Sequence, residues 1–479
     1  MISSAQKSLF ESVDIHLSSY LKDWLTFSTQ RYTLPEQNIQ DIRASITHSL
    51  YTYGLSPRFL DPAQTILYAA SPYPAPYTLL LSLQLPSLPM EPEQQEAYML
   101  PLFASITAYQ HLQQLFHPQN QTNSRSPFIP IAPITPIAFK WLITLTPSHS
   151  LHATGTSKQA SYTTVERIIQ KQHSLLKADG CLLFTPHSEL DIFTSTAEDP
   201  LETLPQLILG SRGRLQVELV TNTTTRQLPT HYGTIVPDAA WQLLWALNSI
   251  KDAREDVLID DFYDQLKAPE DELLSVLATL AGRTHISEQD CGVAHLIAGL
   301  HGVQQLYAYF LTPSCSVTHL QCVPGMQPAR HEQAESREQT ALAGYARARL
   351  DFHLVPEQDP EAIFSSLQRH LSQQRDQSIE VHKITAHAPG VTSIGERLVD
   401  VTRTAFQAAY SRPPILVPLG ANVPTFSLLR RELKLPTLAI ALPWLTQTQS
   451  NTTQAMPAVY IEQLLKTFVL LFAEMGEKE

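Results

Sequence analysis

The sequence predicts an α/β protein in two parts: a domain formed from both ends of the chain, and a smaller ferredoxin-like α+β domain inserted into it. In the first half, helical patterns alternate with continuously apolar strand segments, which is typical of a largely parallel sheet covered on both faces. From Leu215 the strand segments alternate instead, in the order strand, helix, strand, strand, helix, strand. After about Pro389 the first pattern returns. We therefore expect one domain over 1–209 and 386–479, and the inserted domain over 210–385.

Apolar residues at helical spacing predict the helices of the first half, and short apolar runs predict its strands. The expected helices are Ser4–Thr26, Pro35–Tyr53, Ala97–Phe116 and Tyr162–Lys177. The expected strands are Thr65–Tyr68, Tyr77–Leu85, Ala138–Leu145 and Gly180–Phe184.

The same patterns define the second half of the chain. In the inserted domain we expect strands Leu215–Asn222, Ala346–Val355 and Ile379–Ile384 and helices Asp238–Ile250 and Asp359–Gln374, with Lys251–Gln339 partly an insertion. The C-terminal part is expected to contain strand Thr437–Leu442 and helices Ile394–Tyr410, Thr425–Glu432 and Val459–Met475.

Composition excludes several classes of function. The formal net charge is −12 and the one short basic run, Leu429–Lys434, suits a solvated helix face, so nucleic acid is not an expected partner. No apolar run is long enough for a signal peptide or a membrane span, and we expect a cytoplasmic protein. Four cysteines in 479 residues make no disulfide framework. Cys315, His319 and Cys322 lie too close together on one strand-like segment to favour a zinc site.

Four segments of the second half, in order, resemble phrases of one family. They are LGSRGRLQVE at Leu209–Glu218, VLIDDFYD at Val257–Asp264, RARLDFHLVPEQDPEAIFSSLQRHL at Arg347–Leu371, and GANVP at Gly420–Pro424. The sequence is similar to the dinuclear zinc peptidases of the carnosinase, aminoacylase and succinyl-diaminopimelate desuccinylase family. The resemblance implies a zinc-peptidase-like (phosphorylase/hydrolase-like) sandwich domain with a ferredoxin-like lid that also pairs subunits.

The resemblance also implies two zinc ions, a bridging carboxylate, His and acidic ligands, and a catalytic Glu. None of these groups occurs at the corresponding positions. Those positions are Ala70, Pro72, Ala97, Pro147, Ser148 and Thr185, and QSNTTQAMP replaces the last His-containing loop. In the phrase LPTHYG, Pro229 stands where the family has a histidine that reaches into the partner's site, and His353 replaces the arginine of the family's "R-L-V-P".

A test that does not depend on alignment gives the same result. No Asp or Glu occurs from Ala97 to Val165, the interval that should hold the bridging carboxylate and the Glu pair. No histidine follows His387, so the C-terminal ligand is missing as well. Removing the carboxylates together with the metals avoids crowding like charges in a cleft. Two groups of histidines could be considered as replacement metal ligands, but neither is favoured. His387 lies in a linker, and His149 and His152 lack an anionic partner.

We therefore expect a catalytically inactive homologue without cofactors, retained for ligand binding or assembly. Its expected partner is a second copy through the lid domain, or an active homologue. The ligand-pocket candidates are His231, His353, Gly420 and Asn422. The alternative is a peptidase or N-acyl amino-acid hydrolase with a relocated or metal-free site, in which His231 or the pair Ser148 and His149 would act.

Overall fold

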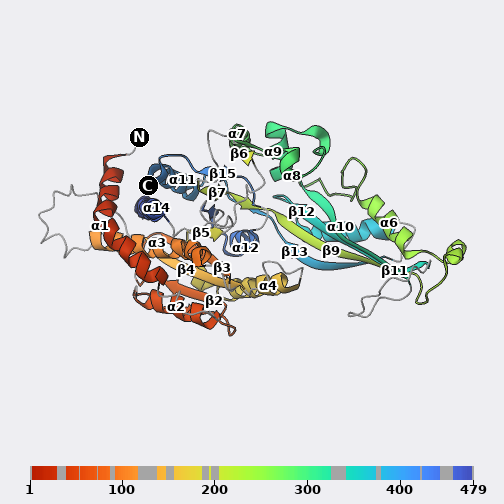
Figure 1. The fold of residues 1–479 in the computed structure, drawn as a ribbon, viewed down its shortest axis with the longest axis horizontal. Coiled ribbons are helices and arrows are strands. Elements are labelled where there is room, and N and C mark those ends of the chain that lie inside the picture. The colour runs from red at the N-terminus through yellow and green to blue at the C-terminus, as the bar shows by residue number, and fades with distance from the viewer. Residues whose placement is uncertain are drawn as a thin grey trace, which may run out of the picture. The chain divides into compact units, whose positions relative to one another are not determined.

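The computed structural model describes residues 3–29, 39–52, 54–72, 74–86, 92–116, 137–146, 156–185, 194–195, 204–324, 341–373, 379–420, 423–442 and 457–476. The chain forms two compact units (Figure 1). The larger unit comprises Met1–Ser211, Glu270–Phe310 and Val391–Glu479, and the smaller unit comprises Arg212–Pro269 and Leu311–Gly390. The α/β class and the presence of an inserted ferredoxin-like unit are confirmed.

The larger unit is built on an eight-stranded mixed sheet in the order β1-β2-β4-β3-β5-β16-β7-β15. Four neighbouring strands run parallel, namely β4 (Ala138–Thr146), β3 (Thr78–Pro86), β5 (Gly180–Thr185) and β16 (Thr437–Ala441). The other strands are β1 (Arg58–Phe59), β2 (Ile66–Ala70), β7 (Gln206–Ile208) and β15 (Ile415–Val417). Both β2 and β7 run against their neighbours in the parallel group.

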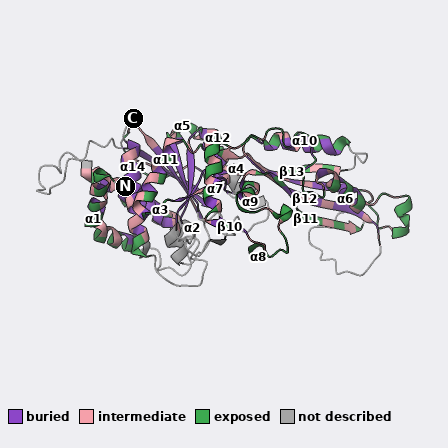
Figure 2. Cartoon of the chain, turned by 90° about the horizontal axis from the view of Figure 1, so that it is seen from above, coloured by how far each residue is buried: buried purple, intermediate pink, exposed green. Residues whose placement is uncertain are grey.

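Helices cover both faces of this sheet, so its strands are apolar on both sides. One face packs against α1 (Ser4–Thr29), α2 (Ile39–Thr52), α3 (Pro92–Phe116), α11 (Arg397–Tyr410) and α14 (Ala458–Gly476), which with the sheet form the main core. The other face packs against α4 (Thr156–Lys171), α5 (His173–Leu176) and α12 (Pro424–Leu433). Figure 2 shows the strands buried between these layers.

The smaller unit follows the predicted order of elements: β9 (Gly213–Asn222), α6 (Ala239–Ile250), β11 (Ser314–Pro324), β12 (Ala343–Leu354), α10 (Pro360–Gln373) and β13 (Ile379–His387). Its antiparallel sheet has the order β11-β12-β9-β13. Alternation along β9 and β12 divides the sheet into two faces. The leucine-rich face packs against α6 and α10 (Figure 1), and the other face is polar.

The interval Lys251–Gln339 contains more structure than the sequence indicated. It supplies β11, the edge strand of the smaller unit. It also supplies α7 (Asp271–Ala281), β10 (Thr284–His285), α8 (Glu288–Cys291) and α9 (Gly302–Leu311). The stretch Glu270–Phe310 belongs to the larger unit, although the expected inserted domain of 210–385 included it. Its sequence pattern did not indicate to which of the two units it belongs.

Candidate functional site

The parallel strands of the larger unit end at one edge of the sheet, which is where ligands commonly bind in α/β proteins. Strand register places Gln84 of β3 opposite Thr144 of β4. On the other side of β3, Leu83 pairs with Phe184, so Thr185 is the next residue in line with Gln84. Residues in register point to the same face of a sheet. Gln84, Thr144 and Thr185 therefore form one uncharged polar row near the carboxyl ends of three adjacent strands.

Gln84 was not among the site positions expected from the sequence, because the end of β2 was expected to form this part of the site. The first metal-ligand positions were placed at Ala70 and Pro72, at the end of β2. Strand β2 runs antiparallel to β4, with Ala70 opposite Lys140 near the start of β4. Ala70 and Pro72 thus lie at the opposite edge from Thr185. A single polar residue near the end of the long apolar run TLLLSLQLP was the available signal for Gln84.

Helix α12 covers this polar row. The amide of Gln84 donates a hydrogen bond to the Thr425 hydroxyl in the first turn of α12. Thr144 donates to the backbone carbonyl of Leu83 at 3.1 Å. Thr144, Thr185 and Thr425 are all buried. The row consists of neutral hydrogen-bonding groups, and the bond from Gln84 to Thr425 ties α12 to the sheet.

The loop before α12 uses its backbone to build the fold. Gly420 is buried, and its N–H donates to the carbonyl of Gly210 at 2.8 Å, beside a bridge to Ser211. The structure thus gives Gly420 a role in strand pairing. Asn422 lies outside the described residues.

The described side chains at this edge do not fit two zinc ions. Zinc in proteins is held by thiolate, imidazole or carboxylate, and a dinuclear site needs several anionic ligands. The row offers amide and hydroxyl groups, with Thr185 at the expected acidic position. Within the described ranges, no group of three or more His, Cys, Asp or Glu side chains is placed to hold a metal. Pro147, Ser148, His149 and His152 lie outside those ranges, and Ala97 is described only as part of helix α3.

His231 and His353 do not share a site within one chain. His231 is exposed on η4 (Thr230–Thr234), with its ring 4.6 Å from that of Tyr232, and Pro229 beside it bridges Ala341 before β12 begins. His353 lies near the other end of β12, opposite Arg214. Twelve extended residues separate Ala341 from His353, or about 40 Å.

His353 belongs to the polar face of the lid sheet. Burial lowers its pKa, Asp351 acts against this, and Arg212 and Arg214 lower the pKa further. Arg214 also lies opposite His387 of β13. His353 is therefore a neutral, half-buried residue at neutral pH, in a basic part of the sheet.

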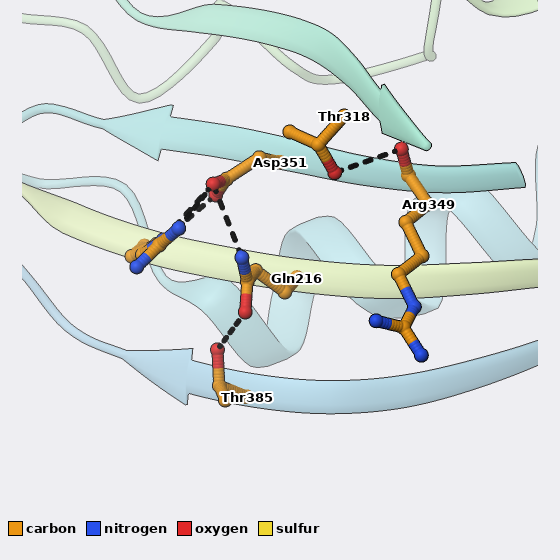
Figure 3. Close-up of polar contacts among 6 residues, drawn as sticks. Gln216, Thr318, Arg349, Asp351 and Thr385 are labelled. Carbon is orange, nitrogen blue, oxygen red and sulfur yellow. Dashed lines mark hydrogen bonds and ion pairs between the residues drawn. The ribbon is translucent and has the colours of Figure 1, made fainter. Parts of the chain in front are cut away.

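A hydrogen-bonded chain organises this face. Asp351, only 4% exposed, accepts from the Arg214 guanidinium at 2.9 and 3.1 Å, with a third, shorter contact. It also accepts from the Gln216 amide at 3.2 Å, and Thr385 donates to Gln216 at 3.4 Å (Figure 3). Three strands are thereby fixed to one another. These bonds join residues of the lid sheet to one another, so the charges of Arg214 and Asp351 serve the lid fold.

The cysteine pattern on β11 makes no metal site. Cys315 faces the core and is buried, which raises the pKa of its thiol to about 12. Cys322 and His319 are exposed. All four cysteines are free thiols.

No protein-family profile matches the chain, and no curated protein sequence matches it. Solved structures do. An M20 family metallo-carboxypeptidase from Sulfolobus solfataricus is 20% identical with a TM-score of 0.63, covering 91% of this chain and 96% of its own. Human carnosine dipeptidase 1 is 13% identical with a TM-score of 0.59, covering 99% and 100%. The di-peptidase Dug1p of Saccharomyces cerevisiae is 12% identical with a TM-score of 0.57, covering 99% of each chain.

These likenesses span nearly the whole chain, so the expected fold is confirmed: it is that of the M20 family metallopeptidases, including the lid. Among the helices that the structure describes, none has the length and apolar character required to span a membrane.

Proposed function

We propose that this chain is a non-catalytic relative of the M20 metallopeptidases that retains their fold for assembly. The main support for this proposal is that no Asp or Glu occurs from Ala97 to Val165. In addition, no histidine follows His387. The first interval includes β4 and its carboxyl end, beside the polar row. Hydrolysis by two zinc ions needs anionic ligands and a general base at this edge. Neutral Gln84 and Thr185 supply neither.

Metal content and hydrolysis test the loss of catalysis. The full chain, refolded or purified with excess zinc and then dialysed, is analysed by elemental mass spectrometry. We expect far less than one zinc ion per chain, and no hydrolysis of dipeptides or N-acyl amino acids. The Cys291→Ser, Cys322→Ser double variant removes the exposed thiols and identifies zinc held there. Two tightly bound zinc ions per chain in that variant would refute the proposal. Hydrolysis abolished by His231→Ala would favour the alternative enzyme.

Assembly is supported by the outer surface of α6. This helix, AAWQLLWALNSI, contains no charged residue, although its buried side chains occupy only one face. Trp241 and Trp245 are 57% and 58% exposed, their ring centroids are 6.1 Å apart, and Leu244 lies between them. Exposed tryptophans on an uncharged helix are typical of a protein interface.

The edge strand β11 continues this surface. Its sequence, SCSVTHLQCVP, contains no Asp, Glu, Lys or Arg, so it lacks the charges that commonly protect a sheet edge. Val317 and Leu320 pair with core residues of β12, so they lie on the same face as α6. They are 51% and 50% exposed. An open strand edge and an apolar helix face thus adjoin each other.

The partner that fits both features is a second copy of this chain. Two β11 strands can pair antiparallel about a two-fold axis, and the two α6 helices then meet on one face of a continuous sheet. Close to the two-fold axis each residue meets its own copy, and an uncharged strand and helix avoid the like-charge repulsion that this would otherwise cause. The proposed dimer needs no residue from an active site.

Oligomeric state tests this partner. The wild-type chain, with a mass of 53.6 kDa, is expected to sediment as a dimer. Trp241→Gln combined with Trp245→Gln is expected to give monomers. Ile15→Gln is the matched control, because Ile15 is 65% exposed on α1 of the other unit. A monomeric wild type, or a dimer unchanged by the tryptophan variant, would refute the proposed surface. Association only with an M20 enzyme would identify a heterodimer instead.

A further inference from the structure

A pocket of about 390 Å³ opens in the smaller unit beside the last turn of α6. Apolar side chains from three elements line it: Leu247 and Ile250 of α6, Val317 of β11 and Leu350 of β12. Helix α6 ends at Ile250, so this part of the edge strand is left uncovered and Val317 stays half-exposed. The volume lies within the range of small-molecule sites, roughly 300–1,000 Å³.

An ion pair stands at the rim of this pocket. The Lys251 ammonium pairs with the Glu255 carboxylate and donates to the backbone carbonyl of Cys315 at 3.1 Å. An ammonium has three N–H groups, and the described residues take two of those of Lys251. The side chains of Lys251 and Glu255 are 28% and 49% exposed, so a ligand can reach both charges.

The turn after α6 holds Glu255 in an uncommon conformation. Its φ of +73° lies in the left-handed region, which residues other than glycine, asparagine and aspartate seldom adopt. The Asp252 carboxylate fixes the turn by accepting from the N–H groups of Arg254 at 2.8 Å and Asp256 at 3.0 Å. Backbone held in this way often accompanies a binding site. Here it keeps a carboxylate beside an ammonium at the mouth of an apolar pocket.

We propose that this pocket binds a free amino acid with an apolar side chain. The ligand carboxylate contacts Lys251, its ammonium contacts Glu255, and its side chain packs against Leu247, Val317 and Leu350. A zwitterion can contact both charged groups of the rim, whereas a ligand with one charge can make a charge-assisted contact to only one of them. The site lies entirely within the smaller unit and does not depend on lost catalysis, and it shares Val317 with the proposed dimer surface.

Calorimetric titration of the full chain with L-leucine tests the site, with three probes that each lack one part of leucine. 4-Methylpentanoate lacks the ammonium, isoamylamine lacks the carboxylate, and glycine lacks the side chain. We expect saturable leucine binding and at least about tenfold weaker binding of each other probe, which corresponds to loss of one charged contact or of the apolar contact. Equal binding of leucine and isoamylamine, or no saturable leucine binding in the millimolar range, would overturn the proposal.

Variants locate the binding. Lys251→Met and Glu255→Gln are each expected to weaken leucine binding at least about tenfold. Lys267→Met is the matched control, because Lys267 is an exposed lysine paired with Glu357 outside the pocket. Val317→Trp fills the pocket without touching its charges and is expected to abolish binding, with circular dichroism confirming that each variant is folded. Unchanged affinity in both Lys251→Met and Val317→Trp would show that leucine binds elsewhere.

Discussion

His111 makes the stability of the larger unit depend on pH. It lies on α3, is 3% exposed, and bonds two side chains of α1: its Nε2 is 2.8 Å from the Ser12 hydroxyl and its Nδ1 is 2.6 Å from the Tyr20 hydroxyl. Ser12 donates its own hydrogen to the Leu9 carbonyl, so Nε2 carries the proton and Nδ1 accepts from Tyr20. The ring is therefore neutral in the folded protein.

Burial, and secondly the charge of His16, lower the pKa of His111 from 6.5 to about 4. The unfolded chain binds this proton at the ordinary value, so it holds more protons than the folded chain between these two pH values. Stability is thus unaffected above pH 6.5 and is lost as the pH falls toward 4. A difference of roughly 2.5 pKa units corresponds to about 3 kcal/mol.

The assay is urea unfolding followed by tryptophan fluorescence, with Trp24 of α1 as a buried reporter. His111→Gln keeps a donor and an acceptor but does not titrate. Between pH 7 and pH 4, the wild type is expected to lose about 3 kcal/mol more stability than this variant. His48→Gln, at an exposed position of α2, is expected to behave as the wild type. Equal pH dependence in wild type and His111→Gln would refute the reasoning.

Three further substitutions test other contacts by denaturant or thermal unfolding. Asp351→Ala leaves the Arg214 guanidinium and the Gln216 amide without their acceptor, and we expect it to lower the free energy of unfolding by about 2 kcal/mol. This is less than for a fully buried pair because Arg214 is 38% exposed, and an unchanged stability would contradict the role of Asp351. Ser82→Ala removes a buried hydroxyl that has no partner among the described residues, so the free energy of unfolding should stay the same or rise by up to about 1 kcal/mol. A clear loss of stability would show that this hydroxyl has a partner. Asp238→Ala removes the N-cap side chain that accepts from two N–H groups of α6, and we expect it to lower the free energy of unfolding by about 1 kcal/mol. An unchanged melting temperature would show that the cap contributes nothing to stability.

Local patterns in the sequence predicted most elements because each pattern reflects one buried face. Strand Ala138–Leu145 became β4, ending one residue later, and helix Asp238–Ile250 became α6 with Asp238 as its cap. The six-element order of the lid was correct because alternating strands and amphipathic helices leave few other arrangements. Two three-residue strands, β7 and β15, were missed, since so short a segment has no measurable period.

The candidate site was harder because it depends on strand direction. Periodicity is the same whether a strand runs up or down, so Ala70 was grouped with Thr185 although β2 is reversed. Gln84 reaches the site only through its register with Thr144 and Thr185, which the sequence does not display. The absence of Asp and Glu from Ala97 to Val165 was more accessible to sequence reasoning, because it holds under any alignment.

The position of β16 also determines when the larger unit can be completed during synthesis. This strand lies between β5 and β7 in the middle of the sheet, although it begins only at Thr437. A ribosome that has made the first 400 residues has produced every strand of the lid, but the large sheet still lacks this central strand. The lid can fold as its residues emerge, since it is a compact unit of its own. Until Thr437–Ala441 has been made, the edges of β5 and β7 that pair with β16 lack this partner, and unpaired strand edges favour association with other chains.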